Sequence, residues 1–139
     1  MNIKETIAER FAGFVWHDSV LKSINIERSD AEYDVRLIVR MSGGSNENFT
    51  DTEVHFVRTR AISTGIDLLA LKLCSGMIWD ANCCTDITNL ETSKIDLESL
   101  PDLAPDTIDL DKMVVFTISL IPPSGSLVVL AEDFHTYVG

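Results

Sequence analysis

The sequence predicts an α+β protein with one domain over residues 1–139, an antiparallel sheet of about six strands, an N-terminal helix and one central buried helix. Three observations predict this fold. Apolar residues recur at helical spacing in residues 3–12, alternate with polar residues in residues 32–41, and flank a proline-glycine turn late in the chain. The length of 139 residues, 45% of them hydrophobic, supports one core, because a protein of this size buries about two-thirds of its unfolded surface.

The N-terminal helix is predicted over residues 3–12. Asn2, followed three positions later by Glu5, is a variant of the capping box that begins helices. Gly13 interrupts the pattern, so we expect the helix to end there. The apolar positions at helical spacing are Ile3, Ile7, Phe11 and Phe14.

Two strands follow, over residues 19–28 and 32–41, and we expect them to form an antiparallel hairpin. One register keeps an apolar face and a polar face separate. That register pairs Ile24 with Leu37, Asn25 with Arg36, and Ile26 with Val35.

The middle of the chain predicts a strand over residues 53–62, a helix, and a short strand over residues 77–85. The helix corresponds to the apolar run 66–74, which Gly76 ends. Only Asp67 and Lys72 are polar in that run, so we expect the helix to be covered on most sides.

The last predicted element is a hairpin of residues 113–121 and 126–132, joined by the turn Pro122-Pro123-Ser124-Gly125. Both faces of this hairpin are largely apolar. Such strands lie in the centre of a sheet or cover their second face with a partner. A homodimer formed through this C-terminal hairpin is therefore one expectation.

The chain carries 22 acidic and 11 basic residues, a formal net charge of −11. Phosphate backbones and anionic membranes are bound by clustered Lys and Arg, so neither nucleic acid nor a membrane is expected as a partner. Residues 1–60 sum to −2 and residues 61–139 to −9. Because an acidic surface attracts a basic protein, we expect a basic protein partner. Its predicted contacts are Asp96, Glu98, Asp102, Asp106, Asp109 and Asp111.

An enzyme is the alternative, with a catalytic site around His17, Asp18 and Asp80. A His beside an Asp can act as a general base with an orienting carboxylate, although neighbouring residues of an extended segment point apart. This enzyme would act on a small ligand or with the help of a metal, and His135 is a further candidate for its site. A separate metal site would join His17, His55 and His135 with Asp80 or Asp133. No metal-ligand spacing occurs in the sequence, so the expectation is that the protein uses no metal and no cofactor.

The sequence also predicts a cytoplasmic location. Charged residues interrupt the apolar residues of positions 1–14, unlike a secretory signal, and no apolar run is long enough to cross a membrane. The three cysteines, Cys74, Cys83 and Cys84, are an odd number and suit reduced thiols better than a disulfide framework.

Three short motifs carry a resemblance to a known group of proteins. They are Trp16-His17-Asp18-x-x-Leu21-x-x-Ile24, Ile78-Trp79-Asp80-Ala81, and Pro122-Pro123-Ser124-Gly125-Ser126-Leu127. In these motifs the chain resembles small bacterial proteins of α+β fold, some of which are classed as immunity proteins of polymorphic toxin systems. The resemblance implies a non-catalytic protein that binds and neutralises a toxin, often a basic nuclease, through an acidic face. It implies no catalytic residues.

Overall fold

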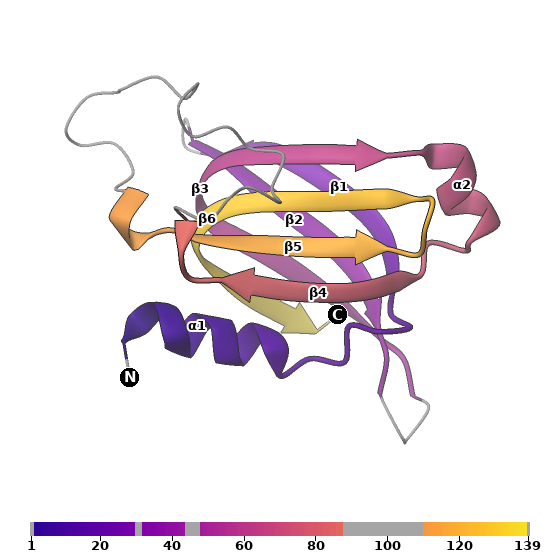
Figure 1. Cartoon of the computed structure of the whole chain (residues 1–139), viewed down its shortest axis with the longest axis horizontal. Coiled ribbons are helices and arrows are strands. Elements are labelled where there is room, and N and C mark those ends of the chain that lie inside the picture. The colour runs from indigo at the N-terminus through magenta and orange to yellow at the C-terminus, as the bar shows by residue number, and fades with distance from the viewer. Residues whose placement is uncertain (1, 30–31, 44–47, 88–109, 139) are drawn as a thin grey trace.

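The computed structural model describes residues 2–29, 32–43, 48–87 and 110–138 (Figure 1). Six strands form one antiparallel sheet in the order β1-β2-β3-β6-β5-β4. The strands are β1 (Val20–Ser29), β2 (Glu32–Met41), β3 (Thr50–Ile66), β4 (Ile78–Cys84), β5 (Val114–Leu120) and β6 (Gly125–Val138). The helices are α1 (Ile3–Ala12), α2 (Leu68–Leu73) and a 3-10 turn at Leu110–Lys112.

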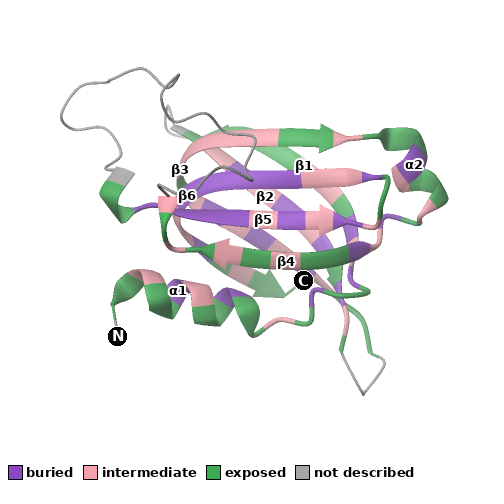
Figure 2. Ribbon diagram, viewed as in Figure 1, coloured by how far each residue is buried: buried purple, intermediate pink, exposed green. Residues whose placement is uncertain are grey.

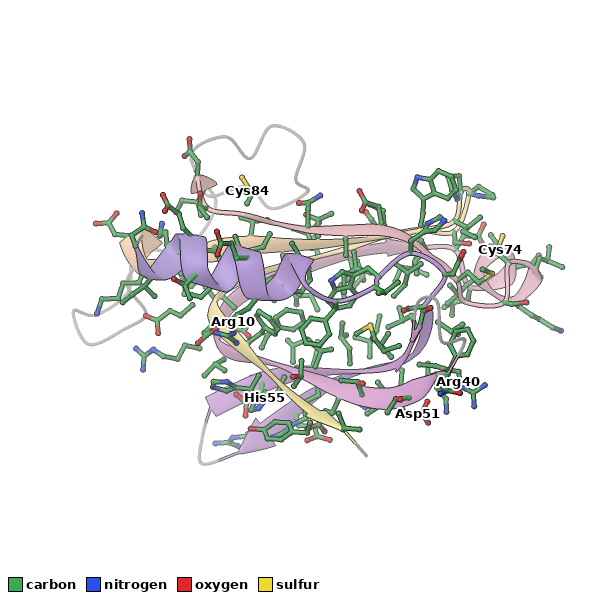
Figure 3. The ribbon with its side chains drawn as sticks, turned by 90° about the horizontal axis from the view of Figure 1, so that it is seen from below. Arg10, Arg40, Asp51, His55, Cys74 and Cys84 are labelled. Atoms are coloured by element: carbon green, nitrogen blue, oxygen red, sulfur yellow. The ribbon has the colours of Figure 1, made fainter. Side chains whose placement is uncertain are left out.

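The sheet is folded into two layers because β3 and β6 are long and bend together. β2 pairs only with the first part of β3, up to Phe56, whereas β5 pairs only with the first part of β6, up to Ala131. Between these regions the β3–β6 register shifts at Thr59, as in a β-bulge, which bends a strand. Figure 3 shows the two layers with the core side chains between them.

The core between the layers is rich in aromatic rings. Phe11 of α1 contacts Trp16, Phe116 and Phe134, with ring centroids 4.5, 5.0 and 5.2 Å away. All four side chains are buried. Burial of one such side chain contributes about 1.5–3 kcal/mol, so this cluster holds α1 against the sheet.

We call the lines along which the edges of the two layers meet the seams of the molecule. Described residues close two of them. At the first, the beginnings of β1 and β4 are joined by main-chain hydrogen bonds, including one of 2.7 Å from Ile78 N to Ser19 O. At the second, α1 lies along β4 (Figure 1). There Lys4 Nζ donates to Thr85 O and the Arg10 guanidinium donates to Phe134 O, at 3.3 and 2.7 Å.

Several predicted elements are confirmed. The first helix has the predicted bounds, and Asn2 caps it by accepting a hydrogen bond from Glu5 N. The β1–β2 hairpin has the predicted register, with Ile24 opposite Leu37 and Ile26 opposite Val35. The α+β class and the six-stranded antiparallel sheet are also observed.

The central buried helix is the part of the prediction that is wrong. The apolar run 66–74 divides: Ile66 ends β3, and α2 spans only Leu68–Leu73. Ala70 is the only buried residue of α2, because the helix lies beyond the end of the sheet (Figure 2). Its apolar composition therefore does not reflect core packing.

The C-terminal hairpin occupies the centre of the sheet, since β5 and β6 each have strands on both sides. Its second face is buried within the single chain, where the side chains form a small cluster with Ala61 and Ile87 at its edge. The buried members are Met113, Val115, Val128 and Leu130. The homodimer stays a prediction, but this face is already covered in the monomer.

Candidate protein-interaction surface

The short helix α2 is held at the end of β3 by its caps. The Asp67 carboxylate accepts hydrogen bonds from Leu69 N and Ala70 N, at 3.0 and 3.1 Å. Asp67 N donates to Ser124 O in the turn between β5 and β6. Such a short helix is unstable in isolation, so these bonds and the buried Ala70 fix its position.

Three leucines of α2 point into solvent. Leu68, Leu69 and Leu73 are 75%, 67% and 76% exposed. Figure 2 shows α2 as mostly exposed, beyond the end of the sheet. Exposed apolar residues that occur singly are ordinary, but a group of them marks an interaction site on a soluble protein.

An apolar groove adjoins these leucines at the third seam, between β1 and the second part of β3. The groove has a volume of about 510 Å³. It is lined by Ile24, Ile26, Ile62, Thr64, Ile66 and Leu68. Ile24, Ile62 and Ile66 also pack against the core, whereas Ile26 is 58% exposed. We call this groove, together with Leu69 and Leu73, the aliphatic surface.

The charges next to the aliphatic surface are not balanced. Arg28 lies two residues beyond Ile26 on the same side of β1, and Lys72 lies one helical turn beyond Leu68. Both cations are exposed, and neither has an ion-pair partner among the described residues. The neighbouring acids are engaged: Glu27 contacts Arg36, at 3.4 Å, and Asp67 caps α2. As far as the described residues show, the rim of the groove therefore carries two cations without ion-pair partners, in a chain whose net charge is −11.

The acidic face predicted from the sequence falls mainly outside the described residues. This applies to Asp96, Glu98, Asp102, Asp106 and Asp109. Asp111 is described, and it is exposed in the 3-10 turn before β5. The contact of these acids with a basic partner stays a prediction.

The residues of the alternative enzyme site form no enclosed group. His17 Nε2 lies 3.6 Å from Asp18 Oδ1, and both side chains are more than half exposed. His17 Nδ1 donates to Trp79 O at 2.8 Å, which ties the turn before β1 to β4. Asp80 is exposed, and among the described residues it forms no hydrogen bond or ion pair with either His17 or Asp18. In the described structure the contacts of His17 tie the turn before β1 to β4.

The histidines do not gather into a metal site. His55 and His135 are directly opposite each other on β3 and β6, and His55 Nε2 lies 3.4 Å from Asp34 Oδ2. His17 lies on the turn before β1, next to β4, apart from this pair. Within the described ranges no group of three or more His, Cys, Asp or Glu residues could hold a metal ion.

The cysteines are free thiols in the described structure. Cys74 follows α2 and Cys84 ends β4, so the two lie at opposite ends of the molecule (Figure 3). The pKa of Cys83 is raised to about 12, chiefly by burial and to a smaller extent by the charges of Cys84 and Asp133. Cys83 is therefore protonated at neutral pH and is not a nucleophile.

The fold and the aliphatic surface together define the class: an α+β protein with a two-layered antiparallel sheet and an exposed aliphatic patch at one end. No family model, curated protein or solved structure matches the chain. No helix within the described ranges is long and apolar enough to span a membrane.

The sequence prediction missed the aliphatic surface. Its members come from two segments far apart in the chain, residues 24–26 and 62–73, and only the bend of β3 brings them together. The apolar run 66–74 gave no signal for this surface, because its composition is the same whether a core or a partner covers it.

Proposed function

We propose that the protein is a non-catalytic binding protein that contacts a protein partner through its aliphatic surface. The observation that carries this proposal is the exposure of Leu68, Leu69 and Leu73 beside an apolar groove. These leucines contribute little to the core, since only Ala70 of α2 is buried. Burial of one exposed leucine by a partner would contribute about 1.5–3 kcal/mol to binding.

An immunity-type inhibitor is the specific form of this proposal. The resemblance in the Trp16-His17-Asp18 segment and the excess of acid support it. In this form the acids between Asp96 and Asp111 attract a basic toxin and raise the rate of association. The aliphatic surface would supply apolar contact area, because charged rims contribute more to rate and specificity than to affinity.

The test compares two double variants of the full chain. Leu69→Ser/Leu73→Ser removes two exposed leucines of the aliphatic surface. Ile3→Ser/Val15→Ser is the matched control, since these residues are also exposed, at 79% and 44%, but lie on and after α1. Each variant and the unchanged chain are used to capture proteins from the cells that encode the chain.

We expect one captured protein to be lost with the Leu69/Leu73 variant and kept with the Ile3/Val15 variant. Titration with that purified protein should then show a loss of affinity of about tenfold or more per leucine. If the two variants capture the same proteins in the same amounts, the aliphatic surface is not a binding surface and the proposal is wrong.

A further inference from the structure

Within residues 2–29, 32–43, 48–87 and 110–138, the seam between β1 and the second part of β3 has two strand edges that no other strand pairs with. β2 leaves β3 after the Val35–Phe56 pair, so among the described strands residues 57–66 of β3 pair with β6 alone. β1 pairs with β2 on one side, and on its other side only its beginning is bonded, at Val20 and Leu21. No described strand pairs with the remaining edge of either one.

Free edges expose main-chain N–H and C=O groups that can pair with another extended segment. Between these two edges lies the apolar groove of about 510 Å³, with its lining of isoleucines. A strand placed against residues 57–66 would continue the sheet toward β1, and every second side chain would enter the groove. Main-chain pairing and alternating apolar side chains are the two requirements of strand addition.

The charges at the rim indicate what such a strand carries. Arg28 and Lys72 are exposed and without ion-pair partners among the described residues, whereas Glu27 and Asp67 are engaged. An acidic residue at the ends of the entering segment would therefore find an unpaired cation. Among the described residues at the rim, a basic residue would meet like charge or acids that already have partners.

We propose that the seam binds an extended segment of a protein partner by strand addition, and that this segment alternates apolar residues and carries acidic residues at its ends. The inference rests on the proposed protein-binding function and names the chemistry of the segment that enters the groove. It is separate from any contact made by the acids of residues 96–111.

The experiment attaches a probe strand to the full chain. A nine-residue segment alternating valine with threonine, with two aspartates added at each end, is fused after Gly139 through a Gly/Ser linker of about thirty residues. Such a linker spans about 30 Å on average. It gives an effective concentration in the millimolar range, so even weak pairing is detected. The readout is hydrogen exchange at the amides of residues 57–66 that do not bond to β6.

Two further fusions serve as controls. In one, proline replaces each threonine and removes main-chain donors; in the other, lysine replaces each aspartate. We expect exchange to slow about tenfold or more with the aspartate strand, to stay unchanged with the proline strand, and to slow less with the lysine strand. Arg28 and Lys72 are exposed, so Arg28→Glu/Lys72→Glu should leave the fold unchanged. In that variant we expect the lysine strand to slow exchange more than the aspartate strand does.

Equal exchange in all fusions would overturn strand addition. So would a light-scattering mass of two chains for the unfused protein together with protected residues 57–66, because a second copy would then cover the seam. If the probe leaves exchange unchanged but Leu69→Ser/Leu73→Ser still loses its captured protein, the binding function stands and only strand addition is wrong. If the probe slows exchange but Leu69→Ser/Leu73→Ser captures the same proteins as the unchanged chain, strand addition stands and the proposed function is wrong.

Discussion

The indole Nε1 of Trp16 donates a hydrogen bond of 2.6 Å to the main-chain oxygen of Phe11, and the two rings stack with their centroids 4.5 Å apart. Phe11 O lies near the end of α1, where main-chain oxygens have no partner within the helix. One side chain thus satisfies a helix end, fills the core and directs the chain into β1.

Trp16→Phe should lower the free energy of unfolding by about 1–3 kcal/mol, because the variant leaves the buried Phe11 O with only the longer hydrogen bond of 3.5 Å from Phe14 N. Urea unfolding followed by circular dichroism measures the change. Trp79→Phe is the control: Trp79 is 55% exposed, so we expect its change to stay within about 0.5 kcal/mol. Similar losses in both variants would contradict the assigned role of Trp16.

Leu69→Ser/Leu73→Ser should change the free energy of unfolding by no more than about 0.5 kcal/mol, since both leucines are exposed. Leu37→Ala, at a fully buried position, should cost about 2–5 kcal/mol. Urea unfolding of both variants checks this contrast. A large loss in the double variant would mean that the leucines support the fold rather than bind a partner.

The cysteines should differ in their reaction with a thiol reagent at pH 8. The pKa of Cys83 is raised to about 12, so almost none of it is thiolate at pH 8, whereas Cys84 is exposed. Cys84→Ser should remove a fast phase from the reaction of the native protein with Ellman's reagent, and Cys83→Ser should leave that phase unchanged. A fast phase lost with Cys83→Ser would contradict this assignment.

The stability near Asp51 should depend on pH. A hydrogen bond from Lys22 lowers the pKa of the Asp51 carboxyl below its usual 3.8, while partial desolvation opposes this. Arg40 Nε lies 3.7 Å from the same carboxylate (Figure 3). Because the pKa is lower in the folded state, the stabilisation is present above pH 3.8 and is lost as the pH falls through the folded-state value.

Asp51→Asn should therefore reduce stability at pH 7 and make less difference near pH 2. Unfolding curves at several pH values, compared with those of the unchanged chain, show whether the two converge in acid. If the difference between them is constant with pH, the ion pair with Lys22 does not stabilise the folded state.

The acids between Asp96 and Asp111 should raise the rate at which the protein captured in the test above associates with the chain. Replacing Asp96, Glu98, Asp102 and Asp106 with their amides should slow association at low salt, with the difference disappearing in high salt. Stopped-flow mixing measures both. The matched control replaces four other acids, which are exposed on α1 and near β4, and changes the net charge equally. They are Glu5, Glu9, Asp18 and Asp80. Equal slowing in both sets would show an effect of net charge alone.

The β1–β2 hairpin and α1 could be predicted because their sequence patterns are compatible with only one register and one pair of helix ends. The alternation in β2 allows a single register with β1 that keeps Val35 and Leu37 inside, and a shift of one residue would expose both. The α1 helix was predictable for a similar reason, since Asn2 and Gly13 limit it at both ends.

The bend of the sheet and the groove could not be predicted in this way. They depend on the irregularity near Arg58 and Thr59, where Arg58 has a φ of 53° and bonds Glu132 on β6. No residue there is a glycine, which is the usual sequence sign of a positive φ. The exposure of α2 was missed because an apolar run has the same composition whether a core or a partner covers it.

The membership of β3 and β6 in both layers has a consequence for how the chain folds. β3 can complete neither layer until β6, which follows it only after α2, β4 and β5, has paired along its length. Pairings between distant segments form slowly, because a long loop must be ordered before they are made. Until β6 has paired with β3, the aliphatic residues of β1, β3 and α2 stay exposed to solvent. A substitution that weakens β6 should therefore reduce the yield of folded protein, even where it leaves the contacts of the aliphatic surface unchanged.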